Sequence, residues 1–114
     1  MNLNKDLIAL NNFLVYKANE KPTTFKPYLK KITGAVEDLM LDLNIIRIKN
    51  ASIDDKGNVL TKDNGSFIYS TEGNIKLLKD IKEFENTECT EVKLDESILK
   101  FLKEDELDLV EQFI

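Results

Sequence analysis

The sequence predicts an α+β fold that is mostly helical, in a single domain covering residues 1–114. Apolar residues recur at helical spacing through most of the first 49 residues, and helical spacing returns after residue 70. Between these stretches, residues 55–58 and 63–66 form two glycine-containing turn motifs. We therefore expect an N-terminal helical hairpin with a long second helix, a small antiparallel β-hairpin or sheet, and C-terminal helices.

The first expected helix covers residues 4–18. Leucines at positions 7, 10 and 14, with Leu3 just before the helix, follow the spacing of one helix face. Pro22 ends this helix because proline disfavours helical geometry in the preceding residue and cannot donate a backbone hydrogen bond. The proline therefore predicts a break in the chain and then a second helix.

The second helix is expected over residues 24–49, with Thr23 or Thr24 as its N-cap and Asn50 as a left-handed C-cap. Pro27 falls in its first turn, where proline is tolerated. One face carries Tyr28, Ile32, Val36, Leu39, Leu43 and Ile46. We expect the two helices to pack antiparallel, with a later helix covering their open side, through Leu7, Leu10, Leu14, Ile32, Val36, Leu39 and Leu43.

Short β-rich pieces flank the two turn motifs at residues 52–53, 59–61 and 66–69, and a β-hairpin is the expected structure. The run of residues 54–58 also resembles a calcium loop superficially. Lys56 stands at the third loop position counted from Asp54, and no glutamate stands at the twelfth. We therefore favour turns over a metal site.

The last third of the chain is expected to hold a helix over residues 72–85, capped by Ser70 or Thr71. Residues 87–94 alternate as an edge strand would. Asp95 can cap a short helix, and a final helix begins at residues 105–106 and carries the chain to two apolar terminal residues. Because mobile tails are usually polar, this ending predicts that the C-terminus docks onto its own core or onto another subunit.

Composition argues against most catalytic chemistry. The chain has no histidine and a single arginine, and Cys89 is its one cysteine. These counts exclude most catalytic sites that pair a nucleophile with a histidine base, most zinc sites, and a disulfide bond within the chain. The C-terminal carboxylates could act as an acid–base pair, but their helical spacing indicates a solvated face. We expect no enzymatic activity, no metal and no cofactor. The N-terminus lacks the pattern of a signal peptide, and no apolar run is long enough to span a membrane, so a cytoplasmic start is expected.

Charge is distributed unevenly along the chain. Residues 1–36 carry six lysines against two acids, whereas residues 83–114 carry eleven acids against three lysines. The lysines near the first two helices could bind nucleic acid beside aromatic residues. The net charge of −5 repels a polyanion, so a nucleic-acid partner is not expected. The basic region can instead meet the acidic half of the same chain or of a neighbouring subunit.

The order of elements resembles a family of small uncharacterised proteins encoded by tailed bacteriophages. The resemblance covers most of residues 5–114. It rests on the helical hairpin, the turn at residues 55–58, the Gly65–Tyr69 segment, the segment 91–94 and the leucine-rich end at residues 107–114. It implies a phage context, so that the protein would act in the virion or in the cytoplasm of the infected bacterial host. It supplies no catalytic residues.

Together with this resemblance, the sequence predicts a non-enzymatic phage protein that acts by protein–protein binding. The favoured role is a virion or assembly component. Its partner would be another copy, another phage protein or a host protein. The alternative is a phage-encoded inhibitor of a host enzyme or defence protein that uses its acidic C-terminal half to mimic nucleic-acid phosphate. An enzyme that uses carboxylates is a third interpretation. The predicted partner-binding residues are Lys17, Lys21, Lys26, Lys30, Lys31, Leu107, Val110, Phe113 and Ile114.

Overall fold

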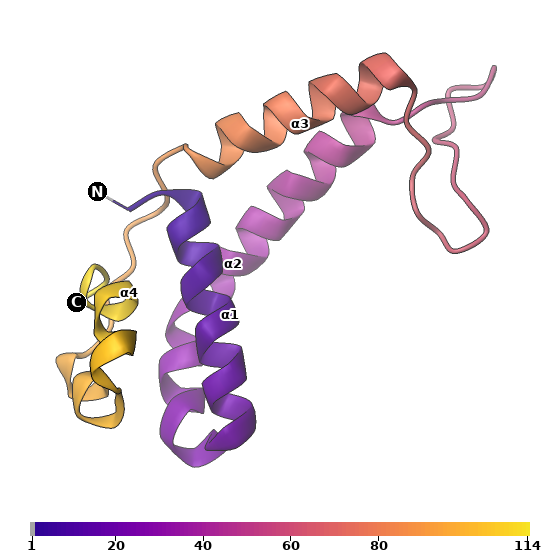
Figure 1. The fold of residues 1–114 in the computed structure, drawn as a ribbon. Helices are drawn as coiled ribbons and strands as arrows, with labels where there is room; N and C mark the ends of the chain where they lie inside the picture. Colours follow the sequence, from indigo (N-terminus) through magenta and orange to yellow (C-terminus); the bar gives the residue numbers. More distant parts are fainter. Residues whose placement is uncertain (1) are drawn as a thin grey trace. The chain divides into compact units, whose positions relative to one another are not determined.

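The structure is a computed structural model that describes residues 2–114. It contains four α-helices and two 3-10 helices within these residues (Figure 1). They are α1 (Asn4–Glu20), α2 (Pro22–Asn50), α3 (Thr71–Glu85), η1 (Glu96–Phe101), η2 (Glu104–Glu106) and α4 (Leu107–Glu111).

The chain divides into two compact units, which we describe separately. The terminal unit comprises residues 2–39 and 86–114, and the central unit comprises residues 40–85. Helix α2 contributes its first part to the terminal unit and its last part to the central unit. The single domain expected from the sequence stays a prediction.

The α+β prediction is wrong, because residues 2–114 contain no β-strand or sheet. Pairing is limited to three isolated bridges, between Leu3 and Glu88, Ile53 and Val59, and Thr61 and Phe67. The expected β-hairpin is absent because the turns occupy most of the segment and leave too few residues for a ladder. The expected edge strand over residues 87–94 likewise pairs only at its beginning, so the fold is helical.

The core of the terminal unit confirms the predicted helical pair. Leu7, Leu10, Leu14 and Ile32 are fully buried, and Val36 and Leu39 are buried as well. Helix α4 contacts α1, which confirms that a later helix covers the pair. The 3-10 helix η1 adds Ile98 to the core. Leu43, also predicted in this contact, is half-buried and belongs to the central unit, and Phe25, which the prediction omits, is buried. Helical periodicity therefore identified most of this core.

Helix α2 begins at Pro22, and not after Thr23 or Thr24 as predicted. The backbone at Lys21 is non-helical, with φ −134° and ψ 76°, so this residue alone forms the break between the helices. Pro22 then occupies the first helical position, where its missing N–H removes no helical hydrogen bond. Pro27 consequently lies inside the helix and not in its first turn.

The predicted left-handed cap at Asn50 is wrong, because no residue other than glycine has a positive φ within residues 2–114. Asn50 is instead the last helical residue of α2 and is buried. Its Nδ2 donates to Ile46 O at 3.0 Å and to Asp80 Oδ2 at 3.0 Å. In the central unit, Asn50 therefore joins the end of α2 to α3.

Helix α3 begins where the sequence predicts. The Oγ of Ser70 accepts a hydrogen bond from Gly73 N at 3.0 Å, which identifies Ser70 as the cap. A Cβ placed on Gly73 would lie 2.7 Å from Asn50 O, so glycine allows the backbone of α3 to approach the end of α2. Leu77 and Phe84 are the buried apolar residues of this helix.

The loop between α2 and α3 contains an eight-residue structural repeat. Gly57 and Gly65 both have φ 84°, and each donates its N–H to a carbonyl three residues earlier. The N–H of Asp54 donates to Asn58 O, and the N–H of Lys62, eight residues later, donates to Ser66 O. Residues 53–60 and 61–68 are therefore two copies of one turn.

Three backbone hydrogen bonds close the base of this loop in a ring. Leu60 N donates to Ser52 O at 2.9 Å, Ile68 N donates to Leu60 O at 3.1 Å, and Ser52 N donates to Ile68 O at 2.8 Å. The participating residues are spaced by eight, like the turns. The ring satisfies backbone groups that a β-ladder would otherwise satisfy.

Candidate protein-binding surface

Lys17 does not belong to a free basic surface. Its side chain is 10% exposed, and its Nζ lies 2.6 Å from Glu106 Oε2. The hydrogen bond to Glu106 raises the Lys17 pKa above its usual value. The pKa of Glu106 is lowered, first by the backbone N–H of Lys103 and then by Lys17. This lysine therefore links α1 to η2 within the terminal unit.

The other four predicted lysines are exposed, and none of the ion pairs found within residues 2–114 includes them. They lie in the turn between α1 and α2 and in the first part of α2. The pKa of Asp95 is lowered mainly by the N–H of Ser97, with a smaller contribution from the charge of Lys31. These residues, Lys21, Lys26, Lys30 and Lys31, form a solvated basic region separate from Lys17.

The predicted C-terminal stripe is divided between core and surface. Val110 and Phe113 are fully buried, Leu107 is half-buried, and Ile114 is exposed. The O of Phe113 also accepts a hydrogen bond from Leu94 N at 2.7 Å. The end of the chain therefore docks on the terminal unit itself. Partner binding by these four residues stays a prediction.

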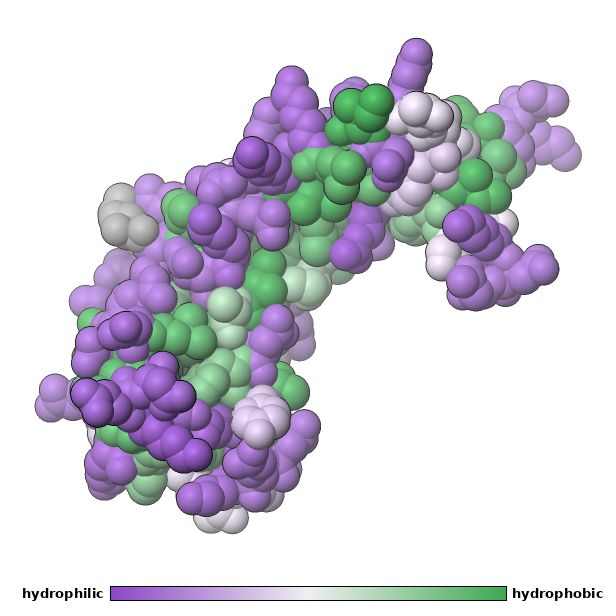
Figure 2. All heavy atoms as spheres, in the orientation of Figure 1, coloured by the Kyte–Doolittle hydropathy of each residue, from purple (hydrophilic) through white to green (hydrophobic). Residues whose placement is uncertain are grey.

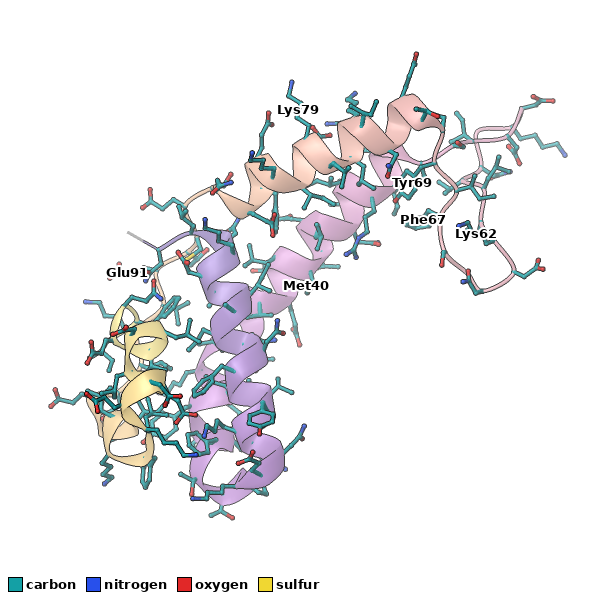
Figure 3. The ribbon with its side chains drawn as sticks, in the orientation of Figure 1. Met40, Lys62, Phe67, Tyr69, Lys79 and Glu91 are labelled. Atoms are coloured by element: carbon teal, nitrogen blue, oxygen red, sulfur yellow. The ribbon has the colours of Figure 1, made fainter. Side chains whose placement is uncertain are left out.

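A cleft of about 310 Å³ lies beside this docked end. It is lined by Asn2, residues 88–93 and residues 112–114. Asn2 Nδ2 donates to Gln112 O at 2.8 Å, and Cys89 is half-buried in the lining, where burial raises the pKa of its thiol. Glu91 is exposed on the same segment (Figure 3). A thiol with a raised pKa is a poor nucleophile, so the cleft does not present an activated cysteine.

The two turns are held by side chains of their own residues. Asp54 Oδ1 accepts hydrogen bonds from Lys56 N at 2.8 Å and from Asn58 N at 2.9 Å. These N–H groups lower the pKa of Asp54. The prediction that this segment is a turn is confirmed. No group of three or more Cys, Asp or Glu side chains within residues 2–114 is arranged to hold a metal ion.

The central unit has a large apolar surface and a small core. Its buried apolar side chains are Leu77 and Phe84. Figure 2 shows hydrophobic residues reaching the surface over the last part of α2, over α3 and over the loop between them. We call these exposed residues the central apolar surface: Met40, Leu41, Ile45, Ile48, Ile53, Leu60, Ile68, Ile75 and Leu78.

Three residues of α2 form the most regular part of this surface. Leu41, Ile45 and Ile48 are 64%, 61% and 42% exposed. Their spacing of four and three residues places them on one helix face. At about 100° per residue, Ile45 lies about 140° around the helix from Asn50, the residue that joins α2 to α3. This Ile45 stripe therefore faces away from the contact with α3.

Helix α3 and the loop carry the remaining apolar residues of the central unit. Ile75 and Leu78 are exposed on α3, on a different face from the buried Leu77 and Phe84. Lys79 extends from α3 away from the ribbon (Figure 3). The loop is anchored to α2 through Tyr69, whose Oη donates to Arg47 O at 3.1 Å. The loop and α3 therefore leave the Ile45 stripe uncovered.

The sequence prediction of partner-binding residues does not include the Ile45 stripe. The signal was present, because leucine and isoleucine at positions 41, 45 and 48 form a second apolar stripe on α2, on the side opposite to the predicted core face. Two apolar stripes on one helix indicate that a second packing partner is needed.

Comparisons with known proteins give no further guide to function. No protein-family model, no curated protein and no solved structure matches the chain. Within residues 2–114, no helix combines the length and apolar character of a membrane span.

Proposed function

We propose that the protein is non-enzymatic and acts by protein–protein binding, as a component of an assembly that contains several copies. The observation that carries this proposal is the central apolar surface. Nine large apolar side chains are exposed in residues 40–85, whereas two apolar side chains there are buried. Large apolar side chains that gather on the surface of one unit, as Figure 2 shows, are typical of an interaction site.

Energetics support a bound state for these side chains. Fully burying a leucine or isoleucine contributes about 1.5–3 kcal/mol relative to leaving it in water. Covering the three residues of the Ile45 stripe would therefore provide several kcal/mol before the cost of association is subtracted. Helix α2 could form equally well with polar residues at these exposed positions. A protein that works as a monomer would therefore not need apolar residues there.

With the resemblance to tailed-phage proteins, the proposal includes action in a virion or in the cytoplasm of the infected bacterium. The inhibitor alternative depends on free acidic groups in the C-terminal half. Glu106 is engaged by Lys17 and by the N–H of Lys103, so this carboxylate is not presented to a partner. Other acids of this half, including Glu104, Asp108 and Glu111, are exposed, so the preference for assembly rests on the central apolar surface.

The test is sedimentation equilibrium of the intact protein over a wide range of concentrations. The proposal predicts species heavier than the 13.1 kDa monomer. Replacing both Leu41 and Ile45 by serine should shift the equilibrium towards monomer. The matched control is Val15→Ser, because Val15 is an exposed apolar helical residue of the terminal unit. The control should associate like the unmodified protein.

A protein that stays monomeric at every concentration would contradict assembly from several copies. If Val15→Ser weakens association as much as the double variant does, the proposal is also contradicted, because the central apolar surface would then have no special role. Melting curves of each variant verify that the central unit remains folded.

A further inference from the structure

We propose that the Ile45 stripe is a two-fold contact between two copies of this chain. Helix α2 of one copy would lie antiparallel to α2 of the other, with the symmetry axis passing beside Ile45. This inference rests on the proposed function and specifies its partner and its geometry. It uses residues 41–49 of α2, all within the central unit.

The positions in the stripe fit such an axis. In an antiparallel two-fold pair centred on Ile45, each residue faces the one equally far from Ile45 in the opposite direction. Ile45 then meets its own copy. Leu41 lies four residues before the centre, at the level of Ile48 and Lys49 of the second copy. The three apolar residues of each helix would thus cover those of the other.

The charges beside the stripe are also self-complementary. At about 100° per residue, Asp42 and Lys49 both lie on the same side of the Ile45 stripe, about 60° and 40° from Ile45. A two-fold axis perpendicular to the helix pair keeps this side of each helix next to the same side of the other. Asp42, three residues before the centre, then meets Lys49, four residues after it, in the second copy. Each contact contains this pair twice.

Both charged groups are available for this pairing. Asp42 is exposed and takes part in none of the ion pairs found within residues 2–114. Lys49 Nζ lies 3.8 Å from Asp80 Oδ2, but the lysine side chain is 60% exposed. A long, exposed lysine can reach a second carboxylate without leaving the first. In a parallel two-fold pair the charged sides of the two helices would lie on opposite sides of the contact, and Asp42 and Lys49 would not meet. The opposite-charge pairs therefore form only in the antiparallel arrangement.

The size of the contact sets the expected strength. Three apolar side chains per copy bury less than the roughly 800 Å² per partner of a stable, specific interface. We therefore expect a weak dimer, with a dissociation constant on the order of micromolar to millimolar, unless neighbouring residues of the central unit add to it. In an assembly of many copies, weak contacts of this kind act together.

The first test is cross-linking in a Cys89→Ser background, which removes the natural thiol. Ile45→Cys should join to itself through a short bis-maleimide, because residue 45 meets its own copy at the axis. The matched control is Ile75→Cys, a residue of α3 that is as exposed as Ile45. The control should give little cross-linked dimer under the same conditions.

The second test reverses the charges. Asp42→Lys and Lys49→Asp should each weaken self-association roughly tenfold, because each replaces two attractive pairs by two repulsive ones. An equimolar mixture of the two variants should associate about as well as the unmodified protein, since the mixed dimer contains two opposite-charge pairs. The mixture also shows whether the variants are folded, because a variant that fails to fold alone would not regain association when it is mixed with the other.

The outcomes separate this inference from the proposed function. The protein could self-associate while Ile45→Cys cross-links no better than Ile75→Cys, or while mixing the two charge variants fails to restore association. Either result would overturn the two-fold contact but not the proposed assembly. A protein that never self-associates would overturn both. Cross-linking at residue 45 together with recovery on mixing would support the contact at Ile45.

Discussion

Lys17 on α1 and Glu106 in η2 form an ion pair with 2.6 Å between Nζ and Oε2, and their side chains are 10% and 15% exposed. The folded-state pKa of Glu106 is lowered below its usual 4.5, so its contribution to stability is present above pH 4.5 and is lost as the pH falls through the lowered value. The pKa of Lys17 is raised above 10.5, so its contribution is complete below pH 10.5 and is lost only as the pH rises through the raised value.

We predict that Glu106→Gln lowers the free energy of unfolding by about 1.5–3 kcal/mol near neutral pH, because a charge-assisted hydrogen bond is lost. The same variant should lose less stability on acidification than the unmodified protein. Urea unfolding of both proteins at several pH values measures this. A double-mutant cycle with Lys17→Met isolates the pair, and additive effects of the two substitutions would contradict the interaction.

We predict opposite outcomes for the last large side chains of the chain. Phe113→Ala should cost about 3–5 kcal/mol, because it empties a fully buried core position. Ile114→Ala should change stability by less than about 0.5 kcal/mol, because Ile114 is exposed. Thermal or urea unfolding of the two variants makes the comparison. Equal effects would mean that the C-terminus is not docked as the structure shows.

Two helical glycines provide a matched pair of substitutions. Gly34→Ala should stabilise α2 by about 0.5–1 kcal/mol, because nothing lies within 4 Å of the new Cβ and alanine is the better helix former. Gly73→Ala should destabilise the protein, because its Cβ would lie 2.7 Å from Asn50 O. Equilibrium unfolding measures both. A stabilising Gly73→Ala would contradict the close approach of α3 to the end of α2.

Helical periodicity predicted the terminal unit well. Leucines at positions 7, 10 and 14 and the face containing Ile32 are buried as expected, because an amphipathic stripe has to pack against another apolar surface. The caps at Ser70 and Asp95 were also predicted correctly, since a short polar side chain before a helix accepts hydrogen bonds from its first N–H groups.

The middle of the chain was harder to predict from residue types. Val59, Phe67 and their neighbours favour strands, yet each turn takes so many of the eight residues in a repeat that only single bridges form. The eight-residue spacing of Gly57 and Gly65 was the better guide to this loop. Local β-propensity was therefore overridden by turn geometry.

The binding surface was only partly predictable. Two apolar terminal residues predicted that the C-terminus docks onto its own core or onto another subunit. Phe113 is buried in the core of the terminal unit, whereas Ile114 is exposed. Lys17 was grouped with its neighbouring lysines by sequence, and its partner Glu106 lies 89 residues away. Sequence proximity does not reveal such a pair.

Protein–protein binding through the Ile45 stripe is tested most directly by isoleucine methyl NMR spectra recorded at rising protein concentration. The methyl signals of Ile45 and Ile48 should shift in a saturable manner, because these side chains leave water on association. The methyl signal of Ile32, fully buried in the terminal unit, should not shift. The largest dissociation constant expected for so small a contact is about millimolar. If the signals of Ile45 and Ile48 stay constant up to that protein concentration, a binding role for this stripe is contradicted.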